Sequence, residues 1–171
     1  MAVVDTAAAG LEAAGRGATI VQLRAPLLSI RQLESAAEAL VSASPLPVLI
    51  SSRADVALAA GAAGVNLPET DLPVAAARRL LGPERLVGRS VHSAAAAREA
   101  EQQGADYVIF GPVFESPTHA GRRGLGLDAL AEVARAVAIP VLAIGGVDPE
   151  RAADCRRAGA GGFAAISYFS R

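Results

Sequence analysis

The sequence has one cysteine, no tryptophan, and aromatic residues at only 4% of its positions. A single cysteine excludes an intrachain disulfide framework and every multi-cysteine zinc site. It fits a reducing compartment, so we expect a cytoplasmic protein. Charge of one sign is also lacking, because 16 Lys and Arg residues nearly balance 17 Asp and Glu residues. Without a basic surface or an aromatic stacking platform, no nucleic-acid partner is expected.

Long apolar runs are missing as well. No stretch reaches the roughly 18 apolar residues that a membrane-spanning helix needs, and the first residues lack the pattern of a signal peptide. We therefore expect no membrane partner and no targeting segment. What the chain does have is 171 residues, 52% of them hydrophobic. This length and composition indicate one compact domain that comprises residues 1–171.

The most informative pattern is a helix tail of glycine and alanine that runs directly into a short apolar strand. It occurs four times, and a glycine in a left-handed turn closes each of these helices. Three further apolar segments lie between them, and one more stands at the start of the chain. The predicted strands are Ala2–Val4, Thr19–Leu23, Pro47–Ile50, Val65–Leu67, Leu86–Ser90, Tyr107–Phe110, Pro140–Ile144 and Phe163–Ile166.

Helix starts are marked by capping residues, since Ser29, Asp71 and Asp148 each stand directly before a helical stretch. Strand and helix therefore alternate along the chain. Continuous apolar strands joined by helices indicate a parallel α/β sheet. Eight such strands favour closure into a TIM barrel, (β/α)8, over the alternative of an open doubly wound sheet.

The barrel predicted here is compact, because such barrels usually take about 250 residues. The sequence stops at Arg171, directly after the last predicted strand, so we expect the last helix to be lacking. Either a partner subunit covers that flank or the sequence is incomplete. The first alternative predicts a homo-oligomer, with a dimer as the simplest form.

Functional groups of either fold lie at the carboxyl ends of the strands. This rule selects Gln22, Arg24, Ser51 and Ser90 as ligand-binding residues. It also marks residues 52–53, residues 66–71 and His92 as further candidates. Arg24 closes an apolar strand, and a buried arginine needs an anion, which is either a ligand or an acidic side chain of the protein.

A phosphate site is expected after the last two strands, where barrels commonly hold phosphate through backbone N–H groups. The alternative is that the two glycines there only form a tight turn. The residues assigned to phosphate binding are Gly145, Gly146, Ile166 and Ser167.

Seven short segments carry a joint resemblance to a known family: Val21–Arg24, Arg53–Leu58, Gly64–Leu67 with Asp71–Pro73, Gly88–Ser93, Gly104–Val108, Gly111–Phe114 and Ile139–Gly146. In this order they resemble the superfamily of thiamine phosphate synthase and TenI, a thiazole tautomerase, over nearly the whole chain. The resemblance implies a (β/α)8 barrel whose small-molecule partner is a thiazole phosphate, with the phosphate on the loops after strands seven and eight.

Three departures from the family synthases concern charge. Those enzymes join a pyrimidine methyl diphosphate to a thiazole phosphate, and the departing pyrophosphate needs concentrated positive charge. They have Glu-Lys where this chain has Ala25-Pro26, and Asn-Asp, with a magnesium-binding Asp, where it has Ser51-Ser52. Asp71 matches their second magnesium ligand, so the resemblance implies magnesium only for a synthase.

The third departure lies in the loop after the sixth strand, where the synthase pattern Thr-x-Thr-Lys becomes Ser116-Pro117-Thr118-His119. By the resemblance, Ser116 and Thr118 bind ligand. A tautomerase only moves a proton on a thiazole phosphate carboxylate, so it needs no metal or other cofactor. Histidine suits proton transfer near pH 7. The family histidine of the sixth strand is Pro112 here, so His119 is assigned as the catalytic residue, and His92 as structural.

These observations leave three hypotheses. The first is a TenI-like thiazole tautomerase of thiamine biosynthesis. The alternative is a diverged thiamine phosphate synthase. The third is a non-catalytic regulatory protein that has kept the phosphate site and lost the chemistry.

Overall fold

The computed structural model describes residues 1–115 and 123–169. In these two ranges no helix has the length and hydrophobicity needed to cross a membrane. Strands and helices alternate in the order β1 (Ala2–Val4), α1 (Ala7–Gly15), β2 (Val21–Leu23), α2 (Ile30–Ala43), β3 (Val48–Ser51), α3 (Ala54–Ala59), β4 (Gly64–Leu67), α4 (Val74–Leu81), β5 (Leu86–Val91), α5 (Ala94–Gln102), β6 (Tyr107–Phe110), α6 (Gly126–Ala136), β7 (Val141–Ile144), α7 (Pro149–Arg157) and β8 (Gly162–Ala164).

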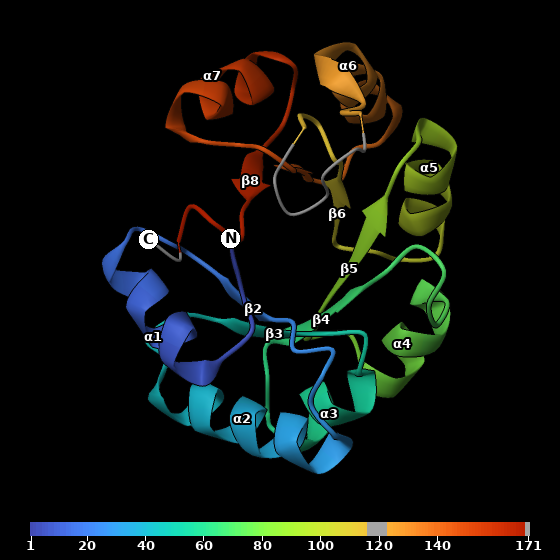
Figure 1. Cartoon of the computed structure of the whole chain (residues 1–171). Coiled ribbons are helices and arrows are strands. Elements are labelled where there is room, and N and C mark those ends of the chain that lie inside the picture. Colours follow the sequence, from blue (N-terminus) through green and yellow to red (C-terminus); the bar gives the residue numbers. More distant parts are fainter. Residues whose placement is uncertain (116–122, 170–171) are drawn as a thin grey trace.

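The strands form one parallel sheet in chain order, from β1 to β8. Its two edges meet, because the N–H of Val3 donates to the carbonyl of Ala165 at 2.9 Å and the N–H of Ala165 donates to that of Met1 at 3.1 Å. The helices lie outside the strands in a ring (Figure 1). This arrangement confirms the TIM-barrel prediction and excludes the open doubly wound sheet.

Side chains that alternate along each strand build two separate apolar clusters. The larger one lies between the sheet and the helices and includes Leu23, Leu40, Val65, Phe110 and Leu130. The smaller one fills the barrel interior. Its buried members are Met1, Val3, Leu49, Tyr107, Ile109 and Ala164. The period of two that separates inward from outward side chains therefore decides which strand residues can reach the mouth of the barrel.

Tyr107 is the largest side chain in the interior cluster, and Gly88 makes room for it. The two residues are direct neighbours on β5 and β6. A Cβ atom on Gly88 would lie 2.0 Å from the Tyr107 Cζ, so the ring occupies the space that any other residue would fill. The Tyr107 hydroxyl is buried and has no hydrogen-bond partner among the described residues. Burial of this group raises its pKa above the ordinary value of 10.

We predict that Tyr107→Phe is neutral or stabilising by about 1 kcal/mol at pH 8, because it removes a buried hydroxyl without a partner. Above pH 10 the unfolded chain loses the phenolic proton while the folded chain keeps it, so wild-type stability falls as the pH rises. The variant lacks this contribution, which amounts to as much as about 1.4 kcal/mol per pH unit. Urea denaturation at pH 8, 10 and 11 tests both effects, and parallel stability curves for the two proteins would contradict them.

Two of the three predicted helix caps are confirmed. Ser29 and Gln32 form a complete capping box on α2, and the Asp148 side chain accepts from the N–H of Arg151 at the start of α7. The prediction for Asp71 is wrong. Its carboxylate accepts from the N–H of Leu72 at 2.7 Å in a local turn, and α4 begins only at Val74, after Pro73. Proline suits a helix start because it has no N–H to satisfy.

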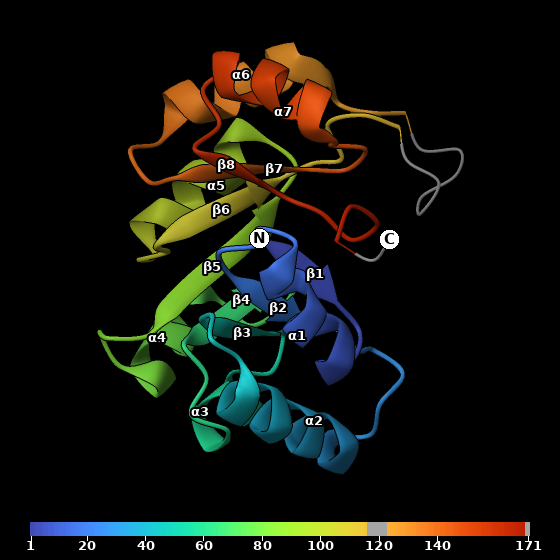
Figure 2. The same ribbon diagram turned by 90° about the vertical axis from the view of Figure 1, so that its left-hand side faces the viewer.

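The sequence predicts that no eighth helix covers the outer side of β8. In the structure, the segment directly after β8 covers this side instead. Residues 165–169 form a bridge and a turn rather than a helix. Phe169 is buried, and its ring stacks on Phe163 of β8 with 6.3 Å between centroids. The Arg16 guanidinium, at the end of α1, donates to the Phe169 carbonyl at 2.6 Å, so this segment lies beside α1 (Figures 1 and 2). Cover by a partner subunit stays a prediction.

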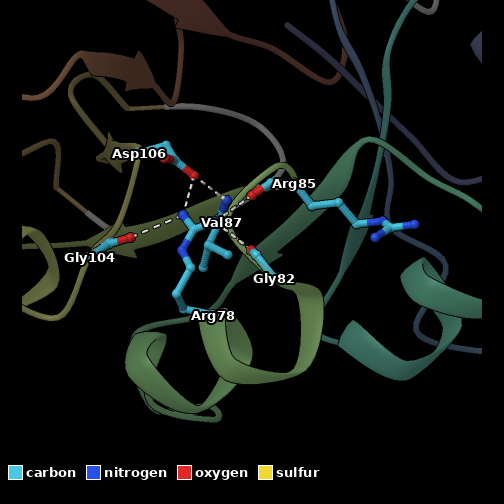
Figure 3. A network of polar contacts seen from close by, with 6 residues as sticks. All are labelled: Arg78, Gly82, Arg85, Val87, Gly104 and Asp106. Carbon is cyan, nitrogen blue, oxygen red and sulfur yellow. Dashed lines mark hydrogen bonds and ion pairs between the residues drawn. The ribbon is translucent and has the colours of Figure 1, made fainter.

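Arg78 on α4 ties together the ends of several elements at the amino-terminal side of the strands. Its guanidinium donates to Asp106 at 2.5 Å and to three backbone carbonyls, those of Gly82, Arg85 and Gly104 (Figure 3). The same Asp106 oxygen accepts from the N–H of Val87 at 2.6 Å. One cation therefore joins α4 to the strands β5 and β6. This side of a TIM barrel contributes stability rather than catalysis.

We predict that Arg78→Ala lowers the free energy of unfolding by about 2–3 kcal/mol, because it leaves a carboxylate and several carbonyls without their charged donor. Arg157→Ala is the matched control, since Arg157 is exposed and, among the described residues, its side chain pairs only with Asp154. It should change stability by less than about 0.5 kcal/mol. Urea denaturation followed by circular dichroism measures both values, and equal losses would contradict the role of Arg78.

Candidate active site

A cavity of about 940 Å³ opens at the carboxyl ends of the strands. Every strand or the loop directly after it contributes to its wall. Some of its lining residues, including Val3, Ile109 and Ala164, also belong to the interior cluster, because their side chains point into the barrel. The cavity therefore lies where the barrel fold positions functional groups.

Four polar side chains on adjacent strands form a row across the cavity wall. The Gln22 amide on β2 donates to the Ser51 hydroxyl on β3 at 2.6 Å. The Asn66 amide on β4 donates to the Ser90 hydroxyl on β5 at 3.0 Å. Ser51 and Asn66 are paired in register, which joins the two hydrogen-bonded pairs. The predicted ligand-binding residues Gln22, Ser51 and Ser90 are thus brought together at one site.

This row has unused hydrogen-bonding capacity. Gln22 and Asn66 are only 4% and 3% exposed. Within the described part of the chain their carbonyl oxygens, Oε1 and Oδ1, are buried and have no partner. A buried polar atom without a partner costs about 1–3 kcal/mol. Two such acceptors on one cavity wall suit a ligand that brings N–H or O–H donors.

Arg24 lies on the cavity wall but is exposed, which corrects the expectation of a buried arginine. Its backbone N–H is anchored to the Val4 carbonyl at 2.7 Å. The guanidinium has no hydrogen bond or ion pair with any described residue. The alternative of an internal pair is not realised, because Glu69 contacts His92 and Asp71 contacts the N–H of Leu72. Arg24 thus offers an uncompensated positive charge to a ligand.

Arg53 also lines the cavity, but its charge is already neutralised. Its guanidinium makes a two-point contact with Asp55, with 2.8 Å between Nε and Oδ1. This hydrogen bonding raises the pKa of Arg53 and lowers the pKa of the Asp55 carboxyl. Of the two cavity arginines, Arg24 is therefore the one available to an anion.

The four residues assigned to phosphate binding all line one part of the cavity, after β7 and β8. Gly145 and Gly146 have φ values of +94° and +62°, which favour glycine. The space is also closed to larger residues. A Cβ on Gly145 would lie 2.6 Å from the Pro112 Cβ, and one on Gly146 would lie 2.5 Å from the Glu115 carbonyl oxygen. No N–H of these two glycines is hydrogen-bonded to another described residue. They form a tight turn on the cavity wall, and its N–H groups have no partner within the part of the chain that the structure describes.

His92 and Glu69 form a pair on the cavity wall, and both were candidates at the strand ends without an assigned role in binding. The Nδ1 atom of the His92 ring lies 2.6 Å from one Glu69 carboxylate oxygen, and the backbone N–H of His92 donates to the other oxygen at 3.3 Å. Both residues line the cavity. His92 had been interpreted as structural, and the structure shows that it also lines the cavity of the candidate site.

Asn66 and Asp148 also line the cavity, although neither was assigned to ligand binding. For Asn66 a signal was present, since it is a polar residue inside an apolar strand, two positions after Gly64. Asp148 had been interpreted only as a helix cap. The predicted ligand residues Ser116 and Thr118 and the predicted catalytic His119 lie outside the described residues.

The described residues do not build a magnesium site from protein side chains alone. Magnesium prefers carboxylate oxygens. The cavity has hydroxyls at Ser51 and Ser52, and Asp71 is not among its lining residues. Of the two carboxylates in the lining, Glu69 contacts His92 and Asp148 caps α7. Throughout residues 1–115 and 123–169, no group of three or more His, Cys, Asp or Glu side chains is placed to hold a metal.

Comparisons with known proteins agree with this geometry. Residues 2–169 match the family described as thiamine monophosphate synthase. Thiamine-phosphate synthase from Chloroflexus aurantiacus is 42% identical over 170 residues, which cover 97% of this chain and 76% of that protein. The enzyme from Methanoculleus marisnigri is 48% identical over 165 residues, or 93% and 77% of the two chains. The solved structure of thiamine phosphate pyrophosphorylase from Pyrococcus furiosus matches with a TM-score of 0.87 and 32% identity, covering 99% of this chain and 86% of that one.

These similarities confirm the family resemblance and favour the synthase alternative over the tautomerase hypothesis. Every relative named above carries the synthase or pyrophosphorylase name. The match extends over nearly all of this chain and includes the cavity residues at the ends of the strands. The chain therefore belongs to the thiamine monophosphate synthase family, and its role is in thiamine biosynthesis.

Proposed function

We propose that the chain is a thiamine-phosphate synthase, which joins a pyrimidine methyl diphosphate to a thiazole phosphate and releases pyrophosphate. The observation that carries the proposal is the identity of 42–48% to proteins of that name over more than nine-tenths of the chain. The cavity supports it, since its size suits two small heteroaromatic ligands with their phosphate groups. The proposed enzyme acts in the cytoplasm on small molecules.

The reaction forms one bond and breaks another. The ring nitrogen of the thiazole forms a C–N bond to the pyrimidine methylene carbon, and the C–O bond from that carbon to the diphosphate breaks. Pyrophosphate leaves with the bonding electrons. The protein must therefore hold two anionic ligands and stabilise the negative charge that develops on the leaving group.

Each part of the cavity suits one of these tasks. The turn at Gly145 and Gly146 offers to the phosphate of the thiazole two N–H groups that pair with no other described residue. The buried carbonyl oxygens of Gln22 and Asn66 accept donors on a heteroaromatic ring. Arg24 supplies the positive charge that the departing pyrophosphate requires. Because the described residues do not build a magnesium site, no step of this proposal is assigned to a protein-held metal.

An activity assay tests the proposal. Purified protein is mixed with both substrates, with and without magnesium, and thiamine phosphate and pyrophosphate are measured chromatographically. We expect the two products in equal amounts, and only when both substrates are present. Absence of both products under all these conditions would overturn the proposal.

The tautomerase is kept as a second candidate because of the His92–Glu69 pair, which places an acid–base group on a cavity that lacks a metal site among its described residues. It predicts isomerisation of the thiazole phosphate carboxylate without any pyrimidine substrate. Conversion of that compound in the absence of thiamine phosphate formation would favour the tautomerase over the synthase. Ligand binding without either product would favour the non-catalytic hypothesis.

A further inference from the structure

Arg151 on α7 lies behind the phosphate-binding turn rather than in the cavity wall. Its Nη1 donates to the Gly146 carbonyl at 2.8 Å. Its guanidinium carbon lies 4.9 Å from the centre of the Phe114 ring, a cation–π contact. The Phe114 N–H in turn donates to the Gly145 carbonyl at 3.0 Å. Arg151 therefore holds both ends of the glycine pair, one directly and one through Phe114.

The same guanidinium lies close to the carboxylate of Asp148. Asp148 lines the cavity, and its carboxylate is half-exposed. A carboxylate in this position repels a bound phosphate. The Arg151 Nε lies 3.9 Å from the Asp148 Oδ2, close enough to offset that charge. The sequence contains no lysine, so only arginine and histidine side chains can provide such compensation.

We propose that Arg151 is a positioning residue for phosphate binding. It fixes the Gly145–Gly146 turn so that the N–H groups face the cavity, and it neutralises Asp148 so that the phosphate does not meet an uncompensated negative charge. The inference rests on the proposed function only in taking the thiazole phosphate as the ligand of this turn. It assigns a binding role to a residue that does not touch the ligand.

The test is calorimetric titration of thiazole phosphate, and of the same thiazole alcohol without phosphate, at low salt. Arg151→Gln should weaken binding of the phosphate compound about tenfold and leave binding of the alcohol unchanged, because only the phosphate senses the lost charge. Arg157→Gln is the matched control. Arg157 lies on the same helix and pairs with Asp154 far along it from the turn. This control should bind both compounds as the wild type does.

A double variant separates charge from structure. In Arg151→Gln with Asp148→Asn the repelling carboxylate is removed, while asparagine still caps the helix. We expect the share of the lost affinity for thiazole phosphate that comes from charge to return, while the share that comes from the Arg151–Gly146 hydrogen bond stays lost. Equal affinities for the Arg151→Gln variant and the wild type, an equal loss for the alcohol, or no recovery in the double variant would each overturn the proposal. If the wild type binds thiazole phosphate but makes no thiamine phosphate, the proposed function fails while the role of Arg151 stands. If the wild type binds neither compound, both are overturned.

Discussion

Gly146→Ala is expected to weaken binding of thiazole phosphate by at least about a hundredfold. The φ of +62° disfavours any residue with a Cβ. That Cβ would also lie 2.5 Å from the Glu115 carbonyl and 2.9 Å from the Phe114 Cβ. The turn must therefore move, and backbone N–H groups bind an anion only when they converge on it. Calorimetric titration measures the loss, and circular dichroism checks that the fold is retained.

Gly61→Ala provides the matched control for backbone strain. Gly61 has nearly the same φ, +66°, but a Cβ there would meet no atom within 4 Å. It also lies away from the cavity, at the end of α3. We expect a loss of about 1 kcal/mol in stability and unchanged ligand binding. The account of the turn would be contradicted if both alanine variants bound thiazole phosphate as tightly as the wild type.

Arg24→Ala is expected to lower kcat/KM by about 10²–10³, the effect typical of removing one group that stabilises charge in the transition state. Because its guanidinium has no partner among the described residues, the melting temperature should hardly change. Arg24→Lys keeps the charge but loses the two-point geometry, so it should recover only part of the activity. Steady-state kinetics with both substrates measure these values.

Arg53→Ala is the control, because Arg53 lines the same cavity with its charge already paired to Asp55. It should change kcat/KM by less than about fivefold, since the ligand gains little from a neutralised cation. If Arg24→Ala and Arg53→Ala reduced activity by the same factor, the assignment of Arg24 to the leaving group would be wrong.

Most of the fold could be predicted because its signals are local. Glycines such as Gly61 and Gly104 adopt positive φ at helix ends, and each precedes a strand at the expected place. The start of α4 could not be predicted in this way. Asp71 is a residue type that often caps helices, but its carboxylate accepts a hydrogen bond from the backbone N–H of its neighbour Leu72. The cover of β8 by Phe169 depends on a stacking contact with Phe163, which no local pattern indicates.

The site was predictable where it depends on the strand ends alone. Gln22, Ser51 and Gly146 all line the cavity, as the fold rule requires. The other contacts depend on register between neighbouring strands. Asn66 meets Ser90 only because β4 and β5 pair with the offset that places Asn66 opposite Gly88. Likewise, whether a cation is free or paired depends on distances in space, and these separate Arg24 from Arg53.

The most direct test of the central claim is ³¹P nuclear magnetic resonance of a mixture of the purified protein, pyrimidine methyl diphosphate and thiazole phosphate. The account predicts that the diphosphate ester signals decay while free pyrophosphate and thiamine phosphate appear at equal rates, and that Gly146→Ala and Arg24→Ala slow both rates together. Spectra that stay unchanged for the wild type, or pyrophosphate that appears without thiamine phosphate, would contradict it.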